Sequence, residues 1–150
     1  AEEGVDESAM GRIYAWQAAI NMAIANPFTG VGLDNFFYNY YFYSPHWDGK
    51  NHAVHSTWMQ IIAETGFAGL VLFLLMLIGA LKVSYQLLKR LNNHEMKPLA
   101  EGLWLGLLSF CVSGTFLTQG TTWPLYILIG LVLALDRLTL SLENKHARHN

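Results

Sequence analysis

Residues 55–69 read HSTWMQIIAETGFAG, and from Phe67 the chain continues to Leu81 without a charged residue. Read back to Thr57, this stretch gives a helical candidate of 25 residues in which Glu64 is the only charge. A helix of about 20 apolar residues crosses the hydrocarbon core of a bilayer. The stretch therefore predicts a transmembrane helix with ionisable residues, His55 and Glu64, near its start.

Two further apolar stretches, about 99–116 and about 121–135, are weaker span candidates. They have the length of helices rather than the ten-residue alternation of barrel strands. The sequence thus predicts an all-α fold, a polytopic membrane protein fragment whose residues 57–150 form a three-helix transmembrane region. Because the chain starts at Ala1 without Met and shows no signal-peptide pattern, we expect further spans upstream.

The overall composition, 53% hydrophobic and 13% charged residues with a net charge of −2, is ordinary. The positions of the charges along the chain are informative about topology. Residues 1–54 contain two basic and six acidic groups, whereas the link 82–97 carries four lysines or arginines and the tail carries three. Short basic loops stay in the cytoplasm. We therefore expect residues 1–56 to face the periplasm as a helical loop, with the cytoplasmic loop 82–97 and the cytoplasmic tail 136–150 inside.

The periplasmic loop begins with a predicted amphipathic helix over about 9–25, capped by Asp6 or Ser8 and ended by Pro27. Arg12 lies in its first turn, where a cation opposes the helix dipole. The position suits an arginine that binds an external anion. A solvated or carboxylate-paired arginine is the ordinary alternative.

An aromatic segment follows, FFYNYYFY over residues 36–43. Amphipathic rings gather at the level of lipid headgroups, so one interpretation is an interfacial belt. The other is a carbohydrate platform, because flat rings with hydroxyl groups can stack on sugars and bond their edges. In that case Tyr40 is a predicted substrate-binding residue.

The next loop brings three histidines close in sequence, and two roles are open to these residues. His46, Asp48, His52 and His55 could bind a metal, but their spacing across a Pro/Gly loop is weak evidence for such a site. His55 is better explained as a general base, since an imidazole can accept a proton from a hydroxyl group near neutral pH. A purely structural histidine is the remaining alternative.

Glu64 lies nine positions after His55, about half a turn away on a continuous helix, so the two cannot share a face. An unpaired carboxylate near the start of a transmembrane span costs free energy, and ionisable residues in spans are usually functional. Glu64 is therefore a candidate site residue. Gly66 and Gly69 are predicted to lie on one face and to permit close helix contact. The single cysteine, Cys111, excludes a disulfide within the chain.

Several short motifs in a fixed order resemble the O-antigen ligase and polymerase superfamily. They comprise Gly11-Arg12 with Trp16, the segment NPFTGVG at 26–32, Asn35-Phe36, His55-Ser56, and ETGFAGL at 64–70. The loop 51–56 is most similar to the O-glycosylation ligases found beside exosortase systems. The resemblance covers about residues 8–80.

The resemblance implies a GT-C-like glycosyltransferase of the bacterial inner membrane, of which this chain is the C-terminal part. Such enzymes transfer a preassembled glycan from undecaprenyl diphosphate to a hydroxyl group on lipid A core, protein or polysaccharide. They need no nucleotide sugar, cofactor or essential metal. The resemblance implies His55 as the base and Arg12 as the ligand of the diphosphate, with Trp16 and Glu64 as further substrate-binding positions. The implied partners are these substrates and membrane lipid, with no nucleic acid.

Ligase and polymerase activities stay open at this point, as do two other classes. A transport subunit should carry paired charges inside several spans, whereas only Glu64 and Glu101 lie in these spans, near their ends. A noncatalytic subunit that binds glycan or lipid would use the aromatic segment alone.

Overall fold

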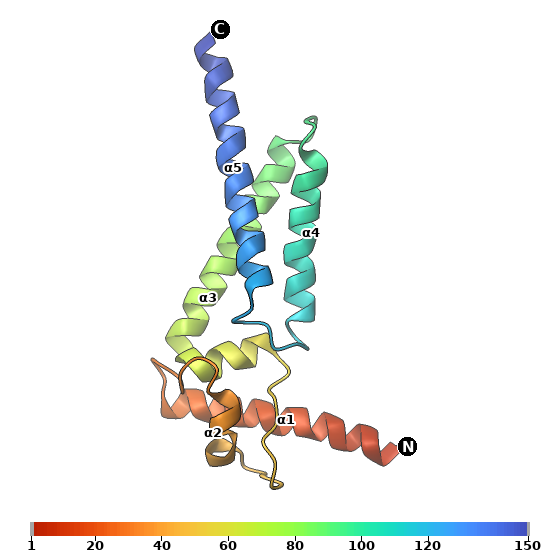
Figure 1. The fold of residues 1–150 in the computed structure, drawn as a ribbon, viewed down its shortest axis with the longest axis vertical. Coiled ribbons are helices and arrows are strands. Elements are labelled where there is room, and N and C mark those ends of the chain that lie inside the picture. Colours follow the sequence, from red (N-terminus) through yellow and green to blue (C-terminus); the bar gives the residue numbers. More distant parts are fainter. Residues whose placement is uncertain (1, 150) are drawn as a thin grey trace. The chain divides into compact units, whose positions relative to one another are not determined.

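The computed structural model describes the backbone of residues 2–149 and the side chains of residues 9–145. It contains α1 (Glu2–Ala25), α2 (Phe36–Tyr43), α3 (Thr57–Arg90), α4 (Lys97–Ser113) and α5 (Trp123–His149), as Figure 1 shows. No strand occurs among the described residues, which confirms the all-α prediction. The chain forms two compact units, one of residues 1–74 with 112–121 and one of residues 75–111 with 122–150.

The first helix is longer than predicted. It begins at Glu2 rather than near Ala9, so Asp6 and Ser8 lie inside the helix and the predicted cap was wrong. Nothing in residues 2–8 breaks a helix strongly, and acidic residues are favourable near a helix N-terminus. The helix ends at Ala25 as expected, because Pro27 has no backbone N–H to continue it.

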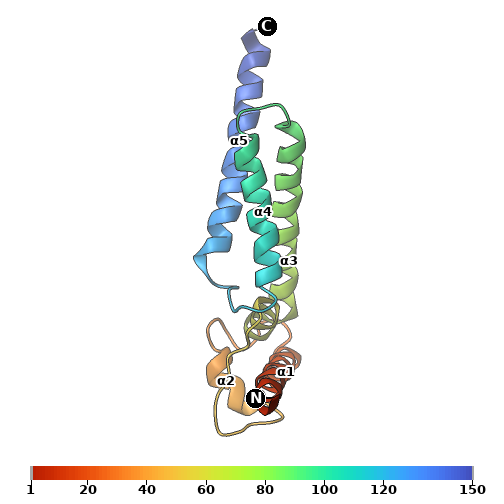
Figure 2. The same ribbon diagram turned by 90° about the vertical axis from the view of Figure 1, so that its right-hand side faces the viewer.

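The core of the first unit is built from small residues of α1 and rings of α2. Its buried members are Ala15, Ala18, Ala19, Met22, Phe36, Tyr40, Val54 and Ala63. Alanines on α1 let α2 approach closely, and Figures 1 and 2 both show α2 beside α1. The aromatic segment is therefore a short helix with one face against α1 and the other exposed.

Helix α3 is interrupted at Gly66, whose φ of 71° and ψ of −172° are not helical. The prediction of an unbroken helix was therefore wrong, and so was the common face expected for Gly66 and Gly69. A Cβ on Gly66 would lie 2.5 Å from the Pro27 carbonyl oxygen, and a Cβ on Gly69 would collide with the Thr65 side chain of the same helix. These glycines permit a kink and its neighbouring turn rather than a helix–helix contact.

The interruption is stabilised by the loop that follows α1. Breaking a helix leaves carbonyl groups and N–H groups without partners. Here Val31 N–H donates to the Ala63 carbonyl at 2.9 Å and Gly32 N–H donates to the Glu64 carbonyl at 3.0 Å. The Phe67 N–H donates to the Pro27 carbonyl at 2.8 Å. The two glycine-containing motifs, 26–32 and 64–70, are thus complementary parts of one backbone junction.

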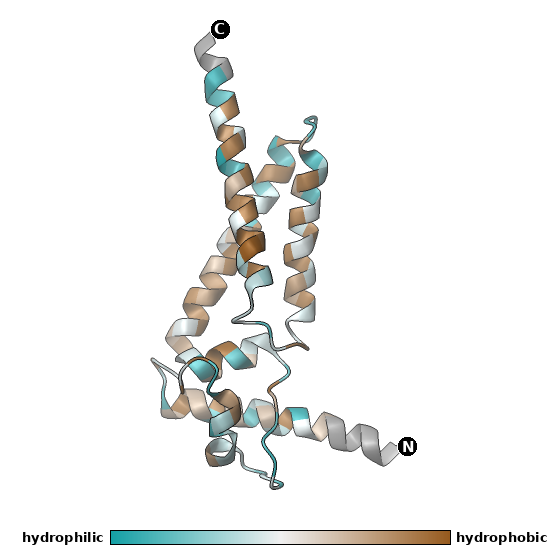
Figure 3. Ribbon diagram, viewed as in Figure 1, coloured by the Kyte–Doolittle hydropathy of each residue, from teal (hydrophilic) through white to brown (hydrophobic). Residues whose placement is uncertain are grey.

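In the second unit, the later part of α3, α4 and α5 lie side by side in both ribbon views (Figures 1 and 2). By length and composition two helices could cross a membrane, α3 and the Trp123–Lys145 part of α5. Helix α4 has 17 residues and is not among them, so its role as a span stays a prediction. Figure 3 shows apolar residues along these helices and a hydrophilic stretch toward the end of α5. Many large apolar side chains are exposed there, as expected for helices that face lipid.

An ionic cluster joins the end of α3 to residues within α5. Arg90 of α3 donates to the Asp136 carboxylate and to the Thr139 hydroxyl of α5, both at 2.6 Å, and lies 3.7 Å from the Glu143 carboxylate. The Arg90 side chain is 27% exposed, so the charges are partly shielded from water. The cluster therefore fixes the pairing of α3 with α5.

We expect Arg90→Ala to lower the free energy of unfolding by about 1 kcal/mol, the scale of a partly exposed ion pair. Thermal unfolding of the detergent-solubilised full-length protein measures this loss. Arg137→Ala, which removes an exposed cation of α5, is the control and should leave the midpoint unchanged. Equal midpoints for Arg90→Ala and the unaltered protein would show that the cluster contributes nothing.

Candidate functional site

His55 occupies an unusual place in the first unit. Its φ is 46°, in the left-handed region that few residues other than glycine adopt. Its neighbours are buried, Val54 at 1% exposure and Ser56 at 2%, while the His55 side chain is exposed. Backbone strain of this kind persists only where the surroundings hold it, and it concentrates at functional sites.

The residues on both sides of His55 are fixed by hydrogen bonds. The indole Nε1–H of Trp16 donates to the Val54 carbonyl at 3.0 Å. On the other side, the Thr57 N–H donates to the Gly114 carbonyl at 2.7 Å, and the Ser56 hydroxyl oxygen accepts the Met59 N–H at 3.5 Å. The backbone of His55 is therefore held between two anchored residues, and its imidazole is presented to the outside.

Helix α1 carries Arg12 one turn before Trp16. Arg12 precedes Trp16 by four residues, so the two share one face of the helix. Trp16 in turn binds the carbonyl of the residue that precedes His55. Arg12 is exposed, as His55 is. Trp16 thus links the helix that carries Arg12 to the segment that carries His55.

The other two loop histidines have side-chain partners. The ring of His46 lies against Tyr14, with centroids 4.3 Å apart. The Nε2 of His52 is 2.9 Å from the Asp48 carboxylate, and its ring meets the edge of Tyr40. Among the residues whose side chains are described, His55 makes no such contact.

The hydrogen bond from His52, together with one from the Lys50 backbone amide, holds the pKa of Asp48 below its ordinary value. Asp48 and His52 therefore form a local pair at the surface of the loop. No group of three His, Cys, Asp or Glu side chains converges among the described residues, so the metal alternative finds no support there.

Two of the predicted substrate-binding residues are buried. Tyr40 is 1% exposed and Glu64 is 3% exposed. Tyr40 packs in the core of the first unit, so its ring is not exposed for stacking on a sugar. The prediction of Tyr40 as a substrate-binding residue was therefore wrong. The spacing of Phe36 and Tyr40, one helical turn, could have indicated the buried face. The exposed rings of this region are Phe37, Tyr38, Tyr41, Phe42 and Trp47.

Glu64 is part of a buried polar network rather than of the exposed surface. Its carboxylate accepts a hydrogen bond from Gln60 at 3.3 Å, and the backbone amides of Asp34 and Phe36 are directed toward it. The side-chain oxygen of Gln60 accepts the Gly120 N–H at 3.0 Å. Glu64 therefore orders the loops around the start of α3, as a paired carboxylate should.

Sequence reasoning missed the polar residues that hold the segment 114–121 against the start of α3. The Thr57 hydroxyl donates to the Leu117 carbonyl at 2.7 Å and accepts the Gln119 N–H at 3.0 Å. The Trp58 indole donates to the Thr115 hydroxyl at 3.3 Å. These pairs are about sixty residues apart in the chain, and no local pattern indicates them.

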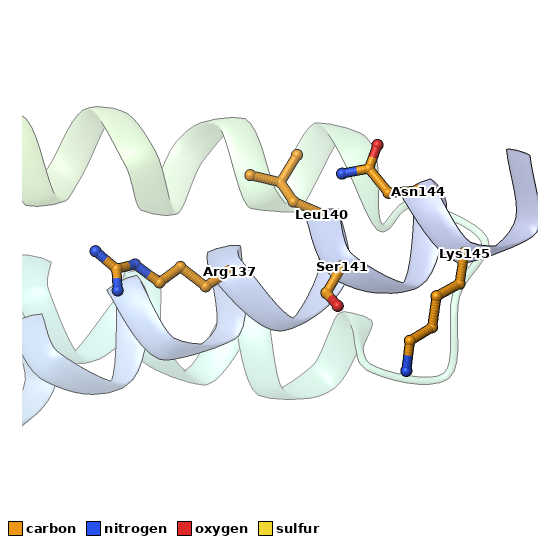
Figure 4. A pocket seen from close by; sticks show the side chains of 5 residues that line it. All are labelled: Arg137, Leu140, Ser141, Asn144 and Lys145. Atoms are coloured by element: carbon orange, nitrogen blue, oxygen red, sulfur yellow. The ribbon is translucent and has the colours of Figure 1, made fainter. Parts of the chain in front are cut away.

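A pocket of about 420 Å³ on α5 contains none of the predicted site residues. Figure 4 shows that its lining side chains, Arg137, Leu140, Ser141, Asn144 and Lys145, all come from this one helix and do not point toward a common centre. We assign it no role.

Comparison with known proteins agrees with the motif order around this site. Residues 1–74 match the O-antigen ligase family. Residues 1–74 belong to this family. The match includes Arg12, Trp16, His55 and the glycine junction, so the predicted superfamily is confirmed for the part of the chain that holds the site.

One curated relative is similar over more of the chain. The exopolysaccharide production protein ExoQ of Rhizobium meliloti (strain 1021) is 30% identical over 104 residues, which are 63% of this chain and 23% of that protein. The chain thus spans about a quarter of the length of this relative. No solved structure matches the chain. The family match and this relative support an O-antigen ligase/polymerase-like membrane protein, and the narrower resemblance to ligases beside exosortase systems stays a prediction.

Proposed function

We propose that the full-length protein is a membrane glycosyltransferase. It transfers a preassembled glycan from undecaprenyl diphosphate to an acceptor hydroxyl group on lipid A core, protein or polysaccharide. The family match of residues 1–74 supports this class of reaction. In the proposal the protein is a multi-pass protein of the bacterial inner membrane, with residues 1–56 on the periplasmic side.

His55 is the general base in this proposal. An acceptor hydroxyl must lose its proton as its oxygen attacks the anomeric carbon, and an exposed imidazole can take that proton. The new C–O bond forms as the bond between the anomeric carbon and the diphosphate oxygen breaks. A single displacement of this kind inverts the configuration at that carbon.

Arg12 binds the diphosphate and stabilises it as it leaves. The departing lipid diphosphate carries negative charge, which a fixed guanidinium group can stabilise through two parallel hydrogen bonds. In this proposal the arginine serves where a metal ion would serve in other phosphate chemistry. Further basic groups could come from other parts of the full-length protein.

The observation that carries the proposal is the structural link from α1 to the base. Trp16 lies one turn after Arg12 and binds the backbone carbonyl next to His55. Among the residues whose side chains are described, His55 is exposed, strained and free of side-chain partners. An exposed base and an exposed cation that are linked in this way fit what transfer from a lipid diphosphate needs.

Ligase and polymerase differ in the acceptor, and the two comparisons carry different names. The family is described by its O-antigen ligases, whereas the name of the similar Rhizobium protein refers to exopolysaccharide production. We favour the ligase because the family match covers the site itself. A polymerase of the same superfamily is the alternative.

The first test of this proposal is the replacement of Arg12 in the full-length protein, reconstituted with undecaprenyl diphosphate that carries its host's glycan. Arg12→Ala should lower the transfer rate at limiting donor by about 10²-fold, the scale of one lost charge-stabilising donor. Arg12→Lys should recover part of this loss because it keeps the charge and loses the planar fork.

Lys50→Ala is the matched control, since it removes the other cation of residues 1–56 from the exposed loop. It should leave the rate unchanged. An Arg12→Ala protein that transfers glycan at the full rate, or an equal loss in Lys50→Ala, would contradict a specific role for Arg12.

A further inference from the structure

Trp16 combines two roles in one side chain. Its ring packs against the core of the first unit, and its indole N–H donates to the Val54 carbonyl. An indole has one donor, its N–H, and here that donor binds the Val54 carbonyl and holds the carbonyl in place. Trp16 is thereby linked to the peptide unit between Val54 and His55.

That peptide unit sets the conformation of His55. The Val54 carbonyl belongs to the same planar group as the His55 N–H, so its orientation constrains the φ angle of His55. This φ is the left-handed value of 46°. The residue after His55 is anchored independently through Ser56 and Thr57. Removal of the indole donor would release one of the two anchors and leave the other in place.

We propose that Trp16 is a positioning residue, which acts through the Val54 carbonyl to hold the His55 imidazole at a fixed place relative to Arg12. This inference rests on the proposed function of His55 and reassigns Trp16, which the resemblance implied as a substrate-binding position. A misplacement of a catalytic group by about 1 Å can cost about 10²-fold in rate. The bond therefore matters for the catalytic step more than for donor binding.

The test uses Trp16→Phe in the full-length protein, because phenylalanine keeps an aromatic ring and removes the donor, together with part of the indole. With undecaprenyl diphosphate that carries the host's glycan, kcat should fall about tenfold while the apparent KM for the donor changes less than twofold, as expected for a displaced base. Trp58→Phe is the matched control, since it removes an indole donor that binds Thr115. It should leave kcat unchanged.

A second measurement does not depend on glycan transfer. Amide hydrogen exchange in the peptide that contains Val54–Thr57 should be faster by about tenfold in Trp16→Phe, as expected for easier local opening. The Trp58→Phe control should not accelerate exchange at His55. Unchanged exchange in Trp16→Phe would show that the indole bond does not hold this segment and would overturn the inference.

A double mutant separates this inference from the proposed function. If Trp16 acts through His55, Trp16→Phe should cause no further loss of residual transfer in a His55→Ala protein. A further tenfold loss in that background would show an independent role and overturn the inference. Full activity of His55→Ala would instead refute the proposed base. Faster exchange with an unchanged kcat would overturn the positioning role alone.

Discussion

Replacing His55 by alanine in the full-length protein should lower the rate of glycan transfer by about 10³-fold, within the range that general base catalysis contributes. The imidazole is exposed and has no side-chain partner among the described residues, so its removal breaks no side-chain contact with them. We therefore expect the protein level, membrane insertion and thermal midpoint to stay close to those of the unaltered protein. Transfer of labelled glycan to acceptor measures the effect.

Two histidines of the same loop make this experiment specific. His46→Ala removes a ring that stacks on Tyr14 and should leave the rate within twofold of the unaltered protein. His52 is the rival base, because Asp48 orients its imidazole as a carboxylate does in many acid–base pairs. If His52→Ala abolished transfer and His55→Ala did not, the base would be His52 and our assignment would be wrong.

Gly30→Ala should prevent the first unit from folding. A Cβ at this position would collide with the backbone of Glu64 and Thr65 and lie 2.5 Å from the Ala63 carbonyl oxygen. These atoms belong to the junction that the Val31 N–H and Gly32 N–H hold in place, so they cannot move away without loss of both hydrogen bonds. The φ of 61° at Gly30 adds strain for any other residue.

The expected loss is about 4 kcal/mol or more, the scale of overpacking combined with a broken backbone network. The yield of monodisperse full-length protein after detergent extraction measures it, and we expect almost none. Gly49→Ala is the matched control, because Gly49 also has a positive φ of 91° but no atom within 4 Å of the added Cβ. Equal yields of the two variants would show that the close contact at Gly30 is unimportant.

The helical class and the first span could be predicted because they depend on local composition. An apolar stretch of sufficient length forms a helix in lipid whatever its partners are. The break at Gly66 could not be predicted in the same way, because it depends on the loop 26–32, more than thirty residues earlier. Glycine permits the kink, but only the hydrogen bonds donated by the Val31 and Gly32 N–H groups and the one accepted by the Pro27 carbonyl make it favourable.

The site shows the same division between residue type and placement. Arg12 and His55 could be selected from their chemistry and from the order of motifs around them. Their connection could not be predicted, since the hydrogen bond from Trp16 to Val54 joins residues 38 apart in the chain, and no local sequence pattern indicates it. The burial of Tyr40 could have been predicted. The composition of the aromatic segment does not separate its buried from its exposed rings, but Tyr40 lies one helical turn after Phe36, and both face the core.

The most direct test of the central claim measures donor binding and transfer separately in His55→Ala and Arg12→Ala full-length proteins. Our account predicts that His55→Ala binds undecaprenyl diphosphate-linked glycan with unchanged affinity and fails to transfer it, whereas Arg12→Ala loses donor affinity as well as transfer. Normal transfer by His55→Ala, or unchanged donor affinity and transfer in Arg12→Ala, would contradict the account.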